Sequence, residues 1–345
     1  MLGKKKIRVA INGFGRIGRA FFRETYSRKD MEVVAINDLG SHENLAYLLQ
    51  YDTVYGKAPF PVSTNGNNLV VDKREVNFYS EKDPTLLPWG ELKIDAVVES
   101  TGIFDDYEKA KAHLTAGARR VVITAPVKNE HELGKTIQIG INDELIKTCP
   151  ITSNASCTTA SASPVIAILD EAIGIEKALL TTTHAYTATQ SLVDSPVPHA
   201  DRHSDLRRGR AASQNIVPSS TGSAIAVTKA YEPLAGKFDG ISLRVPVSCG
   251  SISDITFVAK RETTVEEINA ILEKASKDSR WSDVFAVAHD QLVSSDIIGD
   301  THASIAQLDL TRVIGGNLVK VFAWYDNEAG YTHSLVLHVL KSGNV

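Results

Sequence analysis

The sequence predicts an α/β protein of two domains: a doubly wound parallel sheet, followed by an α+β domain with a mainly antiparallel or mixed sheet. Three observations lead to this prediction. Apolar strands alternate with helices in the first half of the chain, which is the pattern of a parallel sheet covered by helices. After about residue 157 the strand patterns become longer and rich in Thr and Ser. The length of 345 residues also favours two domains over one.

The first forty residues predict one βαβ crossover. Residues 6–12 and 31–37 have the apolar pattern of buried strands, and residues 16–28 between them are predicted to form a helix. Strand and helix patterns continue to alternate through the rest of this half. Further strands are expected at residues 71–79, 95–101, 119–126 and 135–142, and a further helix at residues 107–117.

The second half begins a different arrangement. Long strands are expected at residues 178–189, 239–261 and 318–327, and a helix at residues 264–277. A final apolar stretch, residues 331–342, predicts a helix that can pack back on the first domain. We therefore expect a first domain at residues 1–156, joined by the C-terminal helix 327–345, and a second domain at residues 157–326.

Composition excludes several classes of protein. A net charge of −4 and a pI near 6.2 provide no basic excess for a dedicated nucleic-acid or membrane-surface partner. No apolar stretch has the length of a transmembrane helix, and the basic N-terminus leads directly into a strand pattern, so a cytoplasmic protein is expected. Three cysteines, with no CxxC and no zinc-like spacing, make structural disulfides and a metal site improbable.

A GxGxxG motif at Gly13, Gly15 and Gly18 predicts a dinucleotide site. Three glycines at this spacing also occur in ordinary turns, but here they follow a strand and open a helix. Asp38 ends the second strand twenty residues after Gly18, as the Rossmann-type fingerprint requires. A carboxylate at this position accepts both ribose hydroxyls and repels a 2′-phosphate, so NAD is favoured over NADP. The alternative is that Asp38 only caps the turn after its strand.

The glycines have separate tasks in this motif. Gly13 permits the tight turn, Gly15 lets the backbone approach phosphate oxygens, and Gly18 allows the helix to pack closely on the strand. Amides near Arg16 and Ile17 would then point at the pyrophosphate, with help from the helix dipole.

Cys157 is the candidate nucleophile. It lies in SNASCTT, between a strand and a helical segment, and small or hydroxylated residues surround it. A helix start lowers a thiol pKa and offers amides to an oxyanion. Pro164 leaves two possibilities open: the first turn around Cys157 is distorted, or the regular helix begins at Pro164. Cys149 and Cys249 lack this setting and are assigned to packing.

His184 is the candidate base. It shares one face of a strand pattern with Thr182 and Tyr186. A strand histidine is usually a structural group, and the case for His184 rests on pairing with Cys157, because a thiol nucleophile benefits from a base within hydrogen-bond reach. A long polar segment, residues 191–210, carries four arginines that form either a functional loop or a solvated face.

Seven short blocks occur in one order along nearly the whole chain. They are INGFGRIGR, SNASCTT, HAYT, LRRGRAA, PSSTG, LRVP and WYDNE. In these blocks and their spacing the sequence resembles the phosphorylating glyceraldehyde-3-phosphate dehydrogenases of glycolysis and gluconeogenesis. The resemblance implies an NAD-dependent oxidoreductase that forms a homotetramer, with residues 191–210 near a neighbouring subunit's cofactor site.

The resemblance also implies the reaction. Cys157 as thiolate would attack the aldehyde of glyceraldehyde 3-phosphate, and His184 would take the proton of the resulting thiohemiacetal while a hydride passes to NAD. Inorganic phosphate would then attack the thioester and release 1,3-bisphosphoglycerate. Thr187 and Arg244 would hold one phosphate. The residues that would surround the other phosphate are Ser156, Thr158, Arg208, Thr221 and Gly222.

The same resemblance extends the cofactor site. Asn327 would hydrogen-bond the nicotinamide carboxamide and fix which face of the ring receives the hydride. Asn12, Lys82 and Thr124 match further cofactor positions.

Four positions depart from the family pattern. Ala160 and Ser161 replace an Asn and a Cys, so a second thiol four residues after Cys157 is absent. Thr189 replaces a frequent Asp, and Ala329 replaces a frequent Trp. The arginine-rich loop also carries a few extra residues.

Two other functions compete with this interpretation. Erythrose-4-phosphate dehydrogenase resembles the same family and uses the same thiol chemistry, but the intact HAYT and PSSTG blocks favour a triose phosphate and a phosphate acceptor. A catalytically silent NAD-binding or RNA-binding relative would keep the fold. Such a relative would have no need to keep Cys157, His184, Arg208 and Arg244, so the presence of all four residues argues against it.

Overall fold

The computed structural model describes residues 6–128, 132–197 and 205–345. The chain divides into two compact units, one made of residues 1–155 with 332–345 and the other of residues 156–331. The second unit is therefore inserted between the main part of the first unit and the chain's C-terminal segment.

The first unit contains a nine-stranded sheet in the order β10-β11-β9-β8-β1-β2-β7-β6-β5. All neighbours from β10 to β7 are parallel, while β6 is antiparallel to both β5 and β7. The strands are β1 (Ile7–Asn12), β2 (Met31–Asn37), β5 (Val62–Asn65), β6 (Asn68–Val71), β7 (Arg74–Tyr79), β8 (Ala96–Glu99), β9 (Arg120–Ile123), β10 (Gly134–Thr136) and β11 (Ile151–Ser153). The predicted doubly wound sheet is thus confirmed.

Strand β1 lies at the point where the strand order reverses, since β2 follows it on one side and β8 on the other. Open α/β sheets bind ligands at the carboxyl ends of the strands at such a point. The helices of this unit are α1 (Arg16–Thr25), α2 (His42–Gln50), α3 (Tyr107–Thr115) and the part of α7 (Ala329–Gly343) that begins at Thr332. A small hairpin of β3 (Tyr51–Asp52) and β4 (Gly56–Lys57) follows α2.

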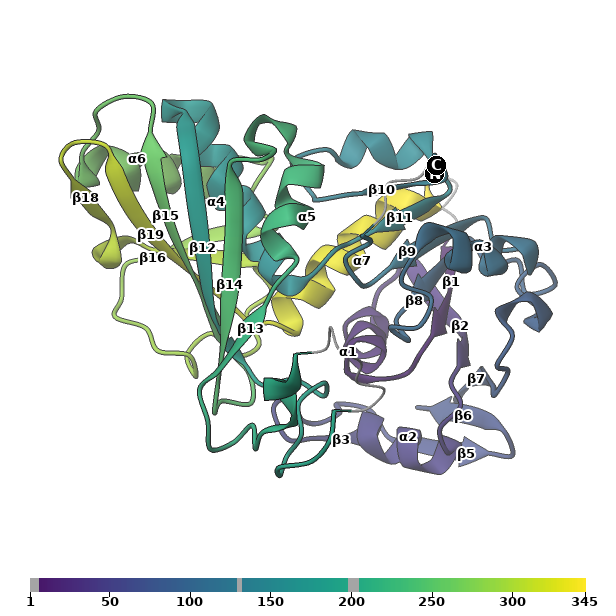
Figure 1. Cartoon of the computed structure of the whole chain (residues 1–345). Coiled ribbons are helices and arrows are strands. Elements are labelled where there is room, and N and C mark those ends of the chain that lie inside the picture. Colours follow the sequence, from purple (N-terminus) through teal and green to yellow (C-terminus); the bar gives the residue numbers. More distant parts are fainter. Residues whose placement is uncertain (1–5, 129–131, 198–204) are drawn as a thin grey trace. The chain divides into compact units, whose positions relative to one another are not determined.

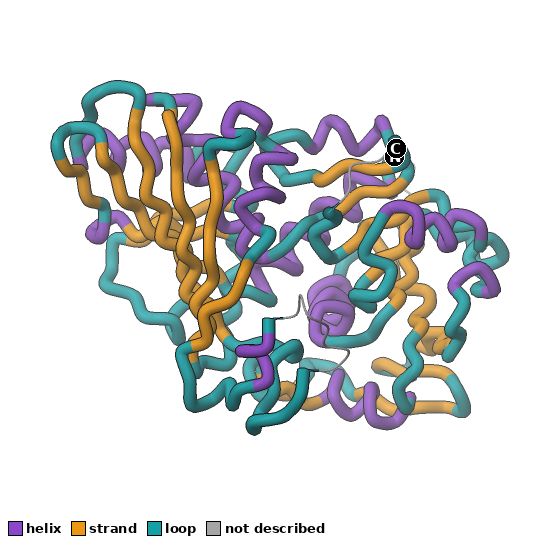
Figure 2. The backbone as a smooth tube through the Cα atoms, viewed as in Figure 1, coloured by secondary structure: helices purple, strands orange, loops and turns teal. Residues whose placement is uncertain are grey.

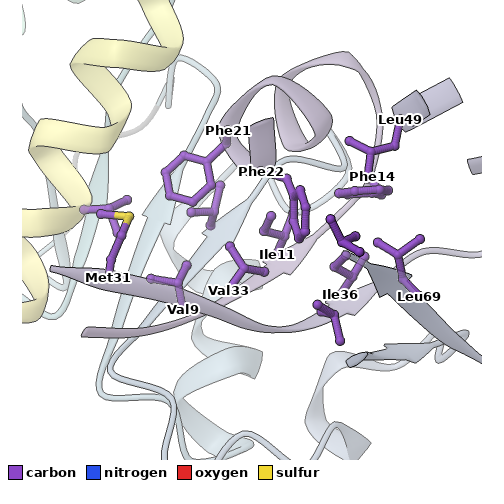
Figure 3. Packing of buried hydrophobic residues seen from close by; sticks show 14 of the residues in the cluster. Val9, Ile11, Phe14, Phe21, Phe22, Met31, Val33, Ile36, Leu49 and Leu69 are labelled. Carbon is purple, nitrogen blue, oxygen red and sulfur yellow. The ribbon is translucent and has the colours of Figure 1, made fainter. Parts of the chain in front are cut away.

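The core of the first unit joins the βαβ crossover to the end of the chain. Figure 3 shows Phe21 and Phe22 of α1 against Val9 and Ile11 of β1. The same cluster contains three fully buried residues of α7, namely Leu335, Val336 and Val339. The expectation that the final apolar stretch packs back on the first domain is confirmed, and Figure 1 shows this helix in yellow.

Two strand predictions in the first unit need correction. Residues 71–79 are not one strand, because Asp72 and Lys73 have φ of 45° and 72° and turn the chain between β6 and β7. Aspartate is among the residues that tolerate this left-handed region, but no glycine or proline marks the turn in the sequence. In the stretch 135–142, only the first residues belong to β10, and Gly140 turns the chain with φ of 83°.

The second unit has an eight-stranded mixed sheet in the order β13-β14-β12-β15-β19-β17-β16, with β18 paired to β19. Figure 2 shows its long strands side by side. The strands are β12 (Ile175–Ala185), β13 (Val217–Ser220), β14 (Phe238–Val245), β15 (Ser251–Ala259), β16 (Phe285–Ala288), β17 (Ser304–Gln307), β18 (Arg312–Ile314) and β19 (Leu318–Tyr325). Two neighbour pairs, β12 with β14 and β16 with β17, are parallel and the others antiparallel.

The expected long strand 239–261 is two strands that do not pair with each other. Pro246 follows the end of β14, and Gly250, with φ of 89°, precedes β15. Strand β12 lies between them, parallel to β14 and antiparallel to β15. Proline cannot donate to a ladder, so the strand ends before it.

Helices α4 (Cys157–Ile173), α5 (Ser223–Ala230) and α6 (Val265–Ser276) pack on this sheet. Alternation along β12 shows which face they cover: Leu180, Thr182 and His184 are buried, whereas Leu179, which points to the opposite face, is 64% exposed. Helix α4 begins at Cys157 and continues through Pro164, so the possibility that the regular helix begins at the proline is wrong.

Candidate active site

The start of α4 and the end of β12 bring Cys157 and His184 together. Cys157 is the first residue of α4, after the cap residue Ser156, whose hydroxyl accepts a hydrogen bond from the Thr159 amide. His184 is the penultimate residue of β12 and is almost fully buried. Cys157 Sγ lies 3.3 Å from His184 Nε2. The thiol and the imidazole can therefore exchange a proton directly.

Arg244 approaches the other side of the imidazole. It faces His184 in the register of β14 with β12, and its Nη1 lies 2.7 Å from His184 Nδ1. The carbonyl oxygen of Ala185 lies 2.6 Å from the same Nδ1 and 3.3 Å from the guanidinium. A guanidinium can only donate and a carbonyl can only accept, so the two neighbours favour different tautomers of His184.

Burial determines the protonation of this pair. Burial, and secondarily the positive charge of Arg244, lowers the pKa of His184 to about 3, so the imidazole is neutral near pH 7. Burial raises the pKa of the Cys157 thiol, while Arg244 and the amides at the start of α4 act in the opposite direction. The helix start therefore does lower the thiol pKa, as expected, but the desolvation of the sulfur outweighs it.

A cluster of hydroxyls joins the starts of α4 and α5. Ser156 Oγ lies 3.0 Å from Ser223 Oγ, and Thr221 donates to the same Ser223 Oγ at 2.8 Å. Gly222 is the cap residue of α5, where no side chain caps the helix. Three of the predicted phosphate residues, Ser156, Thr221 and Gly222, are thus brought together, with helix amides beside them.

The remaining predicted phosphate residues have different surroundings. Thr158 is buried, and its hydroxyl lies 2.8 Å from the Tyr325 hydroxyl. Thr187 follows β12, and its hydroxyl contacts that of Thr189 at 3.0 Å. Arg208 lies in the short 3₁₀ helix Leu206–Gly209. Residues 198–204 of the predicted arginine-rich loop, which include Arg202, lie outside the described residues.

The glycine motif forms the turn between β1 and α1. Gly13 has φ of 92°, and a Cβ there would lie 2.6 Å from the backbone of Ser100 and Thr101. At Gly18 a Cβ would lie 2.3 Å from the Gly13 carbonyl oxygen. Gly15 is the cap residue of α1, and a Cβ there would meet no atom within 4 Å. The first amides of this helix are therefore left without a side-chain cap.

Asp38 organises this turn. One carboxylate oxygen accepts a hydrogen bond from the Phe14 amide at 2.7 Å, and the other accepts one from the Gly40 amide at 2.8 Å. A carboxylate has about four acceptor positions, so capacity remains for ribose hydroxyls. Arg16 directs its side chain to Asp52 at 3.1 Å. Ile17 is partly buried against the core, so its backbone is the part that can meet a phosphate.

The other predicted cofactor residues of the first unit follow the carboxyl ends of strands. Thr124 comes directly after β9, and its amide and hydroxyl both bond to the Glu99 carbonyl. Lys82 is exposed in the turn after β7. Asn12 is buried at the end of β1, where its amide nitrogen donates to Glu99 at 2.5 Å and its oxygen accepts from Asn37 at 2.7 Å. Asn12 therefore links the carboxyl ends of β1, β2 and β8 through its side chain.

Asn327 lies just after β19 in the second unit and is 7% exposed. Its Oδ1 accepts hydrogen bonds from the Gly250 amide and the Ser251 hydroxyl, both at 3.1 Å. The amide end of its side chain can therefore donate to a ligand.

The residues present fit an NAD group. Uncapped amides at the start of α1 suit a pyrophosphate, a close backbone approach is possible at Gly15, and Asp38 suits a ribose diol and opposes a 2′-phosphate.

Sequence reasoning missed three residues that connect this site. Ser223 joins Ser156 to Thr221, Ser251 joins Ala185 to Asn327, and Tyr325 joins Thr158 to Thr182. Tyr325 and Ser223 stand within or beside quoted blocks. Ser251 has no local signal, because its partners are distant in sequence.

Among the described residues, no helix is long and apolar enough to cross a membrane. Within residues 6–128, 132–197 and 205–345, no group of three or more His, Cys, Asp or Glu residues can hold a metal ion. The buried Cys249 thiol donates to Asp326 at 3.1 Å, which agrees with its assignment to packing.

Comparison with known proteins gives the family. The family model of the glyceraldehyde 3-phosphate dehydrogenase NAD binding domain matches residues 7–107, and that of the C-terminal domain matches residues 156–327. A glyceraldehyde-3-phosphate dehydrogenase of Thermotoga maritima is 48% identical over 332 residues, which is 95% of this chain and 97% of the relative. Those of Geobacillus stearothermophilus and Kluyveromyces lactis are 45% and 44% identical, over 96% of this chain and 96% and 98% of the relatives. The chain belongs to the glyceraldehyde 3-phosphate dehydrogenase family.

Proposed function

We propose that the protein oxidises D-glyceraldehyde 3-phosphate to 1,3-bisphosphoglycerate with NAD and inorganic phosphate. The observation that carries this proposal is the 3.3 Å contact between Cys157 Sγ and His184 Nε2 at the start of a helix. In this proposal Cys157 is the nucleophile, His184 is the base, and the amides at the start of α4 bind the oxyanion, all within the second unit.

The first step forms a bond between sulfur and carbon. Cys157, after its proton moves to His184, attacks the aldehyde carbon of the substrate. The carbonyl oxygen gains a proton and becomes the hydroxyl of a thiohemiacetal. The amides at the start of α4 stabilise the negative charge that develops on this oxygen.

Oxidation and phosphorolysis complete the cycle. NAD supplies the acceptor for the hydride that leaves the thiohemiacetal carbon. His184 takes the hydroxyl proton, and the product on Cys157 is a thioester. A phosphate oxygen then attacks the thioester carbon, the carbon–sulfur bond breaks, and the Cys157 thiolate leaves.

The residues of the second unit provide two anion sites for this cycle. We assign one phosphate to Thr187 and Arg244, and the other to Ser156, Thr158, Arg208, Thr221 and Gly222. The hydroxyl cluster of Ser156, Ser223 and Thr221 supports the second assignment. Hydroxyls, helix amides and arginine are suitable donors for phosphate oxygens.

We assign NAD binding to residues of both units. Those of the first unit are Asn12, Gly13, Gly15, Arg16, Ile17, Gly18, Asp38, Lys82 and Thr124. Asn327 of the second unit is assigned to the nicotinamide carboxamide. In this scheme the first unit, with the C-terminal helix, is an NAD-binding domain and the second is a catalytic domain.

We also propose that the protein is a homotetramer that acts in the cytoplasm. The outer face of the second sheet supports self-association, because Leu179, Ile241 and Leu318 are exposed there, and Leu179 and Leu318 line a hollow of about 650 Å³. The test is light scattering at several concentrations, with Leu179→Asp expected to give smaller species. A wild-type monomer at all concentrations would overturn the assignment.

An assay with two aldehydes tests the function. Glyceraldehyde 3-phosphate and erythrose 4-phosphate are each supplied with NAD or NADP, with phosphate present or omitted. We expect turnover of the triose phosphate that needs both NAD and phosphate. Activity on erythrose 4-phosphate alone, independent of phosphate, identifies the competing dehydrogenase. Activity that survives alkylation of Cys157 contradicts the thiol mechanism.

A further inference from the structure

The orientation of the Asn327 side chain is determined by two donors. The Gly250 amide and the Ser251 hydroxyl both bond to Oδ1 at 3.1 Å. A backbone amide can donate but cannot accept, so the atom of the Asn327 side chain that faces Gly250 must be the oxygen. The Nδ2 group is consequently turned away from Gly250 and Ser251.

Ser251 is itself held in place. It is the first residue of β15, is 1% exposed and faces Tyr325 in the ladder with β19. Its Oγ accepts a hydrogen bond from the Ala185 amide at 3.1 Å. Because this bond uses a lone pair, the single hydroxyl hydrogen remains for Asn327 Oδ1.

The Ser251 hydroxyl thus connects two parts of the proposed chemistry. Ala185 follows His184 at the end of β12, and Asn327 follows the end of β19. One oxygen atom joins the strand of the base to the residue assigned to the nicotinamide carboxamide. A rotation of the Asn327 amide by 180° would place its N–H groups against the Gly250 N–H and lose that bond, and the Ser251 hydroxyl could no longer donate to Oδ1.

We propose that Ser251 is a positioning residue for cofactor recognition: it fixes the Asn327 amide with Nδ2 ready to donate to the nicotinamide carboxamide oxygen. This inference rests on the proposed function, in which Asn327 meets the nicotinamide. The Asn327 side chain is prepared before the cofactor binds, so less conformational freedom is lost on binding. Ser251 does not touch the reacting atoms.

Ligand affinity tests this role without measuring turnover. Ser251→Ala should weaken NAD binding roughly tenfold, which corresponds to the loss of one buried hydrogen bond. Binding of ADP-ribose, which lacks the nicotinamide ring, should be unchanged. The matched control is Ser253→Ala, because Ser253 lies two residues along β15 on the same buried face and bonds to Ser161 instead. It should alter neither affinity.

A double-mutant cycle distinguishes positioning from a general structural effect. Ser251→Ala should have no further effect on NAD affinity in an Asn327→Ala background, because a residue that acts through Asn327 has nothing left to position. Ser251→Thr, which keeps the hydroxyl, should restore most of the affinity. In kinetics the alanine variant should raise KM for NAD and lower kcat, while the rate of Cys157 alkylation stays constant.

Three results would overturn the inference: equal losses for NAD and ADP-ribose, equal effects of Ser251→Ala and Ser253→Ala, or additivity with Asn327→Ala. Failure of the proposed function is recognised separately, because the wild-type protein would then lack phosphate-dependent oxidation of the triose phosphate.

Discussion

Cys157 Sγ and His184 Nε2 lie 3.3 Å apart although the two residues come from the start of a helix and the end of a strand. Cys157→Ser should lower kcat about 10³-fold or more, since the weakly acidic hydroxyl replaces the nucleophile. NAD affinity should change little. The control is Cys149→Ser, a buried thiol at the end of a 3₁₀ helix, which should keep its activity. Comparable losses in both variants would refute the nucleophile assignment.

Arg244 should lower the pKa of both groups in this pair. Its positive charge stabilises the Cys157 thiolate and disfavours a protonated His184. In Arg244→Leu, both pKa values should therefore rise, and the pH profile for iodoacetamide alkylation of Cys157 should shift to higher pH. The control is Arg280→Leu, which removes a cation paired with Glu171 at the surface. A shift to lower pH in Arg244→Leu contradicts the arrangement.

Gly13 and Gly15 should respond differently to the same substitution. Gly13→Ala places a Cβ against the Ser100 backbone at a positive φ, so we expect a loss of roughly 2–3 kcal/mol of unfolding free energy. Gly15→Ala meets no atom within 4 Å and should fold normally. Its methyl group should nevertheless lower NAD affinity at least about tenfold by obstructing phosphate oxygens. Denaturant unfolding and NAD titration measure the two effects, and identical behaviour of the variants would refute this distinction.

Thr221→Ala should raise KM for inorganic phosphate about tenfold, because it removes a hydroxyl from the cluster at the start of α5. The control is Thr228→Ala, later in the same helix, where the hydroxyl bonds to the Ile225 carbonyl. The measurement is KM for inorganic phosphate in the wild-type protein and both variants, from steady-state kinetics in which the phosphate concentration is varied. An unchanged KM in Thr221→Ala would assign the phosphate to another place.

His338 makes unfolding depend on pH. Burial lowers its pKa to about 3, and its ring nitrogens bond to Thr152 and Asn154. In the unfolded chain the pKa returns to about 6.5, so between pH of about 3 and about 6.5 the unfolded state binds a proton that the folded state does not bind. Stability contributed by neutral His338 is therefore present above a pH of about 6.5 and is lost as pH falls toward about 3, at about 1.4 kcal/mol per pH unit.

Two substitutions distinguish the effect of His338 protonation on stability from the effect of its packing contacts. His338→Gln and His338→Leu remove the same titration but different contacts, so both should flatten the pH dependence of the unfolding free energy by about one proton. Their stabilities at neutral pH should differ, because only glutamine keeps polar groups for Asn154 and Thr152. Urea unfolding between pH 4 and 7 measures the slope, and an unchanged slope in both variants rejects the account.

Much of the fold could be predicted from periodicity. The strands and helix of the βαβ crossover agree with β1, α1 and β2 within three residues at every boundary. Turns were harder to predict, because no glycine or proline marks the point at Asp72 and Lys73 where the backbone reverses direction. The separation of β14 from β15 also depends on β12, which inserts between them and is distant in sequence.

Sequence motifs predicted the parts of the candidate site that depend on local backbone geometry. Gly13, with its positive φ, and Gly18, with its close contact to Gly13, behave as the glycine motif indicates. The contact of Cys157 with His184 could not be derived from the residues alone, since it depends on how α4 crosses β12. The sequence also did not reveal that burial raises the pKa of the Cys157 thiol, because the extent to which a side chain is buried depends on the tertiary structure.

Helix α7 has a consequence for synthesis of the chain. A ribosome makes Val9, Ile11 and Phe22 long before their partners Leu335, Val336 and Val339, because the whole second unit lies between them in sequence. In addition, a Cβ at Gly343, near the very end of the chain, would lie 2.5 Å from Ile7. The nascent first unit therefore keeps an uncovered apolar surface until α7 has been synthesised. A premature stop before α7 would leave that surface exposed in an otherwise long chain, which is a substrate for chaperones and proteases.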